Sequence, residues 1–258
     1  MIHVATAPWA HTVFDLAAWS CGAAVGYALY RWRLAERVDF VARATGPGYF
    51  LSLAAGAAAG AWLSGSLNTL RQEAPALSHS IAGALGGAIV AVELYKAARG
   101  VRGSTGGVFV GSLATGIAIG RWGCLFTGLP DRTYGLPTTL PWAVDLGDGV
   151  ARHPVQVYES LSMAAFLAVY VAGLAVRAPW ALRRGFYALC IWYGAQRFAW
   201  EFLKPYPSVA GPFNLFHILC AGLVIYGVGY WLRDLADERA GRPQGRALSV
   251  SRPDHQPL

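Results

Sequence analysis

The chain has 258 residues, of which 55% are hydrophobic and 14% are charged. A water-soluble domain would carry about 25% charged residues, so the composition excludes an ordinary globular protein and indicates a lipid bilayer as the solvent. The net charge of +7 suggests nucleic acid, but the basic residues lie between apolar segments rather than on one face, which argues against nucleic acid as a partner.

Seven apolar runs of about 20 residues follow one another along the chain. They cover residues 12–30, 46–66, 78–95, 107–126, 156–176, 185–203 and 213–232. The second to fourth runs are rich in glycine and alanine, which let helices approach closely in lipid. We therefore predict an all-α integral membrane protein with seven transmembrane helices, built as one membrane domain over residues 1–235.

Lysine and arginine residues alternate between the predicted loops. Of these, 15 fall on one side of the membrane and 4 on the other, and Arg121 and Arg197 lie inside predicted spans. Because cytoplasmic loops carry the excess of positive charge, we expect the N-terminus outside and the C-terminus in the cytoplasm. The polar residues 236–258 are predicted to form a disordered cytoplasmic tail.

The four cysteines, Cys21, Cys124, Cys190 and Cys220, lie inside or at the ends of apolar runs and form no CxxC pair. This spacing indicates neither a zinc site nor a disulfide framework. We expect no metal and no cofactor.

Arg121 and Arg197 would both lie in the outer half of the bilayer in this topology. Charges at that depth are expensive and indicate a functional site. Arg121 stands in the run Gly120-Arg121-Trp122-Gly123-Cys124, whose glycines would let a lipid headgroup or a backbone approach closely. The alternative is that Arg121 extends to the outer surface as an interfacial arginine.

Tyr193, Arg197 and Glu201 are spaced by four residues on the sixth predicted span and therefore share one helix face. The guanidinium of Arg197 offers a planar fork to a phosphate, with Glu201 orienting it. The alternative is an ion pair that fastens neighbouring spans together.

A long predicted outer loop, residues 127–155, contains Gly135 and would form a lid or an interfacial arm. It ends in the run Arg152-His153-Pro154-Val155-Gln156-Val157-Tyr158-Glu159, which opens the fifth span. His153 titrates near neutrality and could move protons, although an ordinary interfacial histidine is an equal alternative.

These runs resemble those of the prolipoprotein diacylglyceryl transferase family. Its GR-x-GN-F, RHPxQxYE and YGxxRfxxEf-R patterns are matched in order and spacing between about residues 78 and 232. The resemblance implies seven spans in a bacterial cytoplasmic (inner) membrane. It also implies transfer of diacylglyceryl from phosphatidylglycerol, or another anionic phospholipid, to the lipobox cysteine thiol next to a prolipoprotein signal peptide.

The resemblance further implies roles for individual residues. It assigns catalysis to Arg121, Arg197 and Glu201. It assigns substrate binding to Gly120, Gly123, Cys124, Gly135, Arg152, His153, Gln156, Tyr158, Glu159 and Tyr193.

The chain departs from the family pattern at four positions near this site. Cys124 stands where the family has asparagine, Thr127-Gly128-Leu129 replaces Asn-Gly-Glu, and Ser20 replaces an aromatic residue after Trp19. The family's HGG becomes Ala82-Gly83-Ala84, which leaves His79 as the possible base. A thiolate at Cys124 would need nearby positive charge, which Arg121 would supply. The departures keep an alternative open, a non-catalytic or altered-acceptor paralogue that binds anionic phospholipid.

Overall fold

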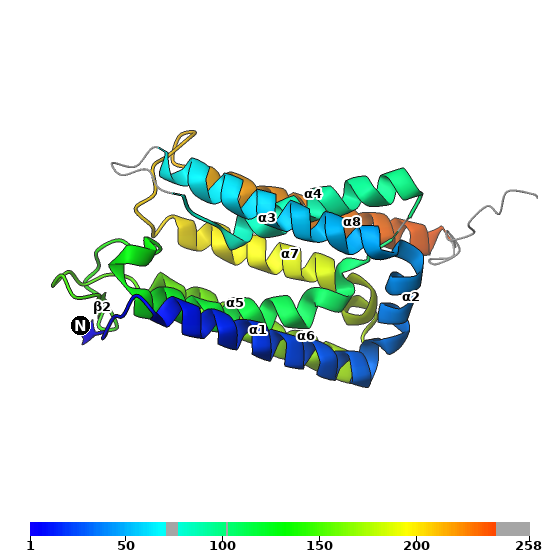
Figure 1. Ribbon diagram of the computed structural model, residues 1–258, viewed down its shortest axis with the longest axis horizontal. Helices are drawn as coiled ribbons and strands as arrows, with labels where there is room; N and C mark the ends of the chain where they lie inside the picture. Colours follow the sequence, from blue (N-terminus) through cyan, green and yellow to red (C-terminus); the bar gives the residue numbers. More distant parts are fainter. Residues whose placement is uncertain (71–76, 102, 241–258) are drawn as a thin grey trace, which may run out of the picture.

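The computed structural model describes residues 1–70, 77–101 and 103–240. Within these residues seven long helices make up the body of the molecule (Figure 1). They are α1 (Ala10–Leu29), α3 (Pro47–Thr69), α4 (Ile81–Arg99), α5 (Val110–Thr127), α6 (Val155–Ala175), α7 (Pro179–Glu201) and α8 (Leu215–Arg239). Each overlaps one predicted apolar run, so the helical architecture is confirmed.

Six of the described helices are long and apolar enough to cross a membrane. The exception among the seven is α7, which carries Arg183, Arg184, Arg197 and Glu201. The protein is therefore a multi-pass, all-helical membrane protein, and its least apolar long helix is the one with the predicted phosphate-binding face.

Helices α3 and α4 pack closely through glycine. A Cβ atom added at Gly60 would lie 2.2 Å from the carbonyl oxygen of Gly83, and one added at Gly87 would lie 2.2 Å from that of Gly56. No larger residue fits at such a contact without moving a backbone. The glycine-rich runs thus have the role expected of them. Lipid provides no hydrophobic effect to bring helices together, and the glycines allow close van der Waals packing instead.

The basic segment after the first span is helical rather than a loop. A π-helical turn (Tyr30–Leu34) continues α1 and leads into α2 (Ala35–Thr45), which lies at the end of the bundle opposite the N-terminus (Figure 1). The sequence from Ala35 to Thr45 contains neither glycine nor proline, so nothing in it interrupts a helix. Gly46, with φ of 67°, then turns the chain into α3.

Short elements at the N-terminal end of the bundle depart from the all-α prediction. Strand β1 (Ile2–His3) pairs in parallel with β2 (Val144–Asp145), and the 3₁₀ turn η3 (Leu129–Asp131) follows α5. A second 3₁₀ turn, η2 (Gly106–Phe109), precedes α5 at the other end of the bundle, where it contacts α2. Strands of two residues carry no readable alternation of polar and apolar residues. The loop 127–155 is therefore an ordered arm that the N-terminal strand holds against the bundle.

The C-terminal helix α8 continues to Arg239, four residues beyond the predicted domain boundary at 235. Residues 241–258, which make up most of the predicted tail, lie outside the described residues.

Candidate functional site

Glu159 in the first turns of α6 is the centre of a buried ion cluster. Its Oε2 lies 2.5 Å from Nε of Arg121 on α5. Its Oε1 lies 2.5 Å from Nη1 of Arg197 on α7 and 2.6 Å from Nζ of Lys204, just after α7. Glu159 is fully buried. One carboxylate therefore joins three elements at the N-terminal end of the bundle.

Glu201 extends this cluster to α8. Its Oε1 lies 2.6 Å from Nε of Arg197, so the ion pair expected from the four-residue spacing forms. Nδ2 of Asn214 donates to its Oε2 at 3.2 Å, and Oδ1 of Asn214 accepts from the backbone N–H of Phe216 and His217. Asn214 thus caps α8 while it holds Glu201.

The charges of this Glu159 cluster do not cancel. It contains three cations, Arg121, Arg197 and Lys204, and two carboxylates, Glu159 and Glu201, all buried. Burying an ion costs several kcal/mol unless it is paired. The unmatched positive charge favours an anion next to the cluster. Burial and the neighbouring Arg197 lower the pKa of Lys204 despite Glu159 and Glu201, so Lys204 is the cluster's first cation to lose its proton as pH rises.

An elongated cavity of about 970 Å³ begins at the two arginines and extends along the bundle to Tyr49 and Thr105. Helices α1, α3, α4, α5, α7 and α8 contribute to its wall. Much of that wall is apolar, with Leu53, Ala57, Leu85, Ile89, Leu113 and Ile117. Trp19 in the wall is 73% exposed, so the cavity reaches the surface beside α1. A cationic end and an apolar body suit a ligand with an anionic head and a hydrocarbon tail.

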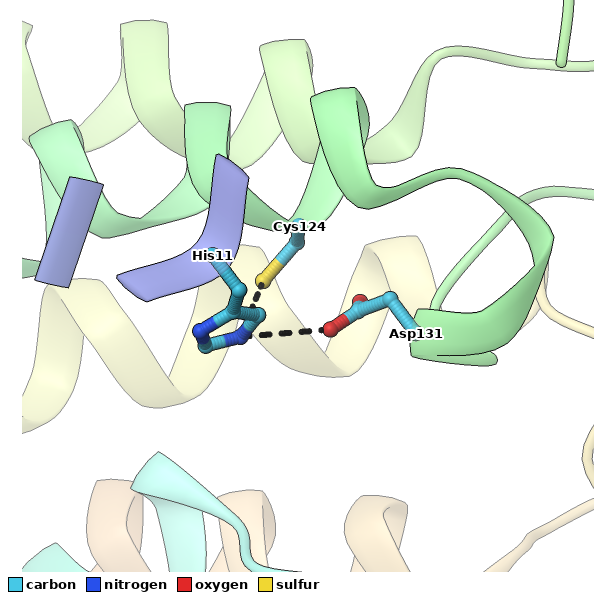
Figure 2. A group of neighbouring side chains, drawn as sticks. All are labelled: His11, Cys124 and Asp131. Atoms are coloured by element: carbon cyan, nitrogen blue, oxygen red, sulfur yellow. Dashed lines mark hydrogen bonds and ion pairs between the residues drawn. The ribbon is translucent and has the colours of Figure 1, made fainter. Parts of the chain in front are cut away.

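A second group of polar side chains, the His11 cluster, lines the same cavity: His11 on α1, Cys124 on α5 and Asp131 in η3 (Figure 2). Nε2 of His11 lies 3.3 Å from Oδ1 of Asp131 and 3.9 Å from Sγ of Cys124. Nδ1 of His11 lies 2.8 Å from Oδ2 of Asp15. The His11 ring therefore has a polar partner on each nitrogen.

Asp131 is held as a carboxylate in this position. Burial alone would raise its pKa, but hydrogen bonds from His11 and Thr133, with the nearby charge of Arg121, bring the pKa of Asp131 below its ordinary value. His11, Cys124 and Asp131 each present one ligand atom, and these atoms lie within 4.8 Å of one another. These three side chains, all within the described part of the chain, could together hold one metal ion.

The predicted site residues fall into two sets around the cavity. Gly120, Arg121, Cys124, Arg197 and His79 line it. Gln156, Glu159, Tyr193 and Glu201 are buried beside it and are not among its described lining residues. Glu159 and Glu201 thus contact the cations rather than the cavity, which makes them positioning residues.

Two predicted glycines serve packing instead. A Cβ at Gly123 would lie 2.8 Å from Cβ of Phe14, so this glycine lets α5 approach α1. A Cβ at Gly135 would lie 2.4 Å from the carbonyl oxygen of His153, where the backbone N–H of His153 donates to the carbonyl of Leu136.

The outward part of the Arg152–Glu159 run fastens the arm. Nη1 of Arg152 lies 2.6 Å from Oδ1 of Asp148, and this bond lowers the pKa of Asp148 to about 2. Nδ1 of His153 lies 3.5 Å from the hydroxyl of Tyr158, which accepts from Nε1 of Trp142 at 2.8 Å. In the described chain none of these side chains lines the cavity.

Sequence reasoning missed His11, Asp131 and Asn214. Two of them leave a local signal: His11 and Asp15 are four residues apart at the start of the first span, and Asn214 stands where a helix cap is expected. Asp131 lies in a polar loop and leaves none. Its partners come from other elements, so only the fold brings it to the site.

Comparison with known proteins identifies relatives of the whole membrane domain. A family model described as prolipoprotein diacylglyceryl transferase matches residues 12–233. No solved structure matches the chain.

Curated relatives share the name phosphatidylglycerol–prolipoprotein diacylglyceryl transferase. One from Finegoldia magna is 33% identical over 123 residues, 47% of each chain. One from Nitratidesulfovibrio vulgaris is 37% identical over 126 residues, 45% of this chain and 44% of the relative. One from Bordetella parapertussis is 32% identical over 157 residues, 59% of this chain and 55% of the relative. The chain spans about half the length of the curated relatives it matches.

Proposed function

Because the chain belongs to the prolipoprotein diacylglyceryl transferase family, we propose that it transfers a diacylglyceryl group from phosphatidylglycerol to a prolipoprotein cysteine thiol. One observation carries this proposal: a buried cluster with an unmatched positive charge stands at the head of an elongated apolar cavity. The names of the curated relatives contain the same donor and acceptor.

The donor lipid would place its phosphate against Arg121 and Arg197 and its acyl chains along the apolar wall. A guanidinium is always charged and presents five N–H donors in a planar fork, which suits phosphate oxygens. Glu159 and Glu201 fix the two guanidinium planes before the lipid arrives, because each carboxylate contacts Arg197 and Glu159 also contacts Arg121. A preorganised site loses little entropy when it binds.

The reaction would break the bond between the glyceryl carbon and the phosphate oxygen, while the acceptor sulfur forms a thioether to that carbon. The electron pair of the broken bond stays on the phosphate of the departing glycerol phosphate. Arg121 and Arg197 lie where this negative charge grows, and donors placed at developing charge are usually the largest single contribution to catalysis. His79, which lines the cavity, would accept the thiol proton.

The proposal includes a topology of seven spans, with the N-terminus outside and the C-terminus in the cytoplasm of a bacterial inner membrane. In this arrangement α7 is the sixth of seven spans, and its buried ions Arg197 and Glu201 are sheltered by Glu159 on α6 and by Asn214 at the start of α8. Reporter fusions after Thr69 and after Arg99 should give opposite sidedness. The same sidedness at both positions would contradict the topology.

Complementation tests the activity. The chain should restore lipoprotein lipidation in a strain depleted of its own diacylglyceryl transferase, whereas Arg121→Gln should not. The matched control is Arg99→Gln, at the C-terminal end of α4 and not among the described residues that line the cavity, and it should complement like the unchanged chain. Normal membrane insertion without lipidation by the unchanged chain would refute transfer, and phosphatidylglycerol binding in that case would indicate the non-catalytic alternative.

A further inference from the structure

We propose that His11, Cys124 and Asp131 form a site for one zinc ion whose fourth coordination position faces the lipid cavity. The sequence indicated no metal, because the three ligands are far apart in the chain and lie on three elements, α1, α5 and η3. The fold brings them together at the wall of the cavity (Figure 2).

The distances between the ligand atoms suit a tetrahedral ion. Zinc binds nitrogen and oxygen at about 2.0–2.2 Å and sulfur at about 2.3 Å, so tetrahedral neighbours lie roughly 3.4–3.6 Å apart. Nε2 of His11 lies 3.3 Å from Oδ1 of Asp131 and 3.9 Å from Sγ of Cys124. All the ligand atoms lie within 4.8 Å of one another. Small side-chain movements would therefore complete the site.

Outer partners already orient the histidine as a metal ligand. Oδ2 of Asp15 lies 2.8 Å from Nδ1 of His11, which favours a proton on Nδ1. A bound ion would replace the proton that Nε2 donates toward Asp131, and the Nε2 lone pair would then face the ion between Cys124 and Asp131. Metal-binding histidines almost always donate their other N–H to a carboxylate, carbonyl or water. The pair Asp15–His11 provides this arrangement on a single helix turn.

The other two ligands have outer partners as well. The hydroxyl of Thr133 donates to Oδ2 of Asp131, which leaves Oδ1 toward the centre of the group. Nη1 of Arg121 donates to Sγ of Cys124 at 3.7 Å and so fixes the position of the sulfur. Three ligands with three separate orienting groups are more than a chance meeting of polar side chains.

Ligand chemistry selects the metal. One nitrogen, one sulfur and one carboxylate oxygen are the donor types of zinc sites, and three protein ligands with one open position are typical of catalytic zinc. Calcium and magnesium prefer oxygen donors alone. A neutral imidazole, a thiolate and a carboxylate also balance the charge of Zn²⁺, so the loaded site adds no net charge to the cavity wall.

The role of the ion rests on the proposed function. The acceptor thiol would bind at the fourth position, where zinc lowers its pKa, and its proton would pass to His79, whose ring centroid lies 6.2 Å from that of His11. The zinc-bound sulfur would then attack the glyceryl carbon of phosphatidylglycerol, and glycerol phosphate would leave with the bonding electrons. The ion would thus activate the acceptor beside the arginines that hold the donor.

Metal content tests the site without any activity measurement. The chain would be purified in detergent with a tag that contains no histidine and then dialysed against Zn²⁺. Inductively coupled plasma mass spectrometry should then find about one zinc per chain. Cys124→Ser, Asp131→Asn and His11→Gln should each reduce zinc content at least tenfold. The control Cys21→Ser, an exposed thiol on α1, should retain it. Equal zinc in the wild type and in Cys124→Ser would overturn the proposal.

Cobalt supplies a spectroscopic signature. Loaded with Co²⁺, the wild type and Cys21→Ser should show a thiolate-to-cobalt charge-transfer band, and Cys124→Ser should lack it. If the wild type shows no such band, His11 instead bridges Asp15 and Asp131 as a metal-free protonated imidazole, and the metal site is refuted.

Transfer assays separate the two proposals. Zinc at one per chain with no diacylglyceryl transfer would refute the proposed function and leave the site standing. Transfer that survives complete removal of the metal by a chelator would refute the role of zinc and leave the proposed function standing.

Discussion

Two polar clusters border the same cavity, and they hold their charges differently. In the Glu159 cluster each ion is at most 5% exposed and the opposite charges lie 2.5–3.2 Å apart. In the His11 cluster the side chain of His11 is 26% exposed and its contacts range from 2.8 to 3.9 Å. The first is closed and tightly paired, and the second is open and loosely paired.

The tightness of the pairing determines which chemistry each cluster can perform. Ions sealed in low dielectric cannot exchange partners cheaply, so the Glu159 cluster supplies a fixed positive field. Side chains with longer contacts and access to the cavity can accept a proton, a metal or a substrate atom. On the proposed function, we therefore assign the donor lipid to the first cluster and the acceptor thiol to the second.

The largest expected effect comes from removing the central carboxylate. Glu159→Gln leaves Arg121, Arg197 and Lys204 without their shared partner, and breaking a buried pair in this way costs about 3–5 kcal/mol. Thermal unfolding in detergent should show a large drop in midpoint. The control Glu36→Gln, at an exposed position on α2, should unfold like the wild type. Equal midpoints for Glu159→Gln and wild type would show that the cluster is not tightly paired.

A smaller change tests the geometry of the arginine fork. Arg121→Lys keeps the charge but loses the planar fork, so transfer should fall by about 10²–10³ in kcat while the fold survives. Single-turnover transfer from phosphatidylglycerol to a lipobox peptide measures this. Unchanged kcat would mean that charge alone, without the fork, stabilises the leaving phosphate.

These residues also show how far sequence reasoning reaches. Hydropathy predicted all seven long helices, because each contains an apolar run of about 20 residues, and four-residue spacing predicted the Arg197–Glu201 pair. The central place of Glu159 was not predictable, since its partners come from α5, α7 and the segment after α7. Helix α2 was missed because its arginines marked a connection between spans, and charge does not distinguish a loop from an amphipathic helix.

The open cluster should respond to pH through Asp131. Because the folded pKa of Asp131 is lowered, its contribution to stability is complete above about pH 4 and is lost as pH falls through the folded value. Asp131→Asn should therefore cost about 1–3 kcal/mol at neutral pH, as for a buried charged hydrogen bond. Chemical unfolding of the metal-free protein should show this difference shrinking in acid. A difference independent of pH would contradict the assignment of Asp131 as a carboxylate.

The smallest effect on stability and transfer is expected in the loop 127–155, where Arg152 and Asp148 form an ion pair away from both clusters. The bond from Arg152 holds the pKa of Asp148 at about 2. In Arg152→Ala it should return toward about 3.9, with little change in stability or transfer. Carboxylate titration by NMR measures the shift. A large loss of transfer would instead place Arg152 in the reaction site.

Lipid retention tests most directly whether the sealed cluster holds the anionic headgroup. Native mass spectrometry of the detergent-released protein should show bound phosphatidylglycerol in preference to phosphatidylcholine. Arg197→Gln should abolish that preference, whereas Arg99→Gln should keep it. Equal retention of both lipids by the wild type, or an unchanged preference in Arg197→Gln, would contradict the account.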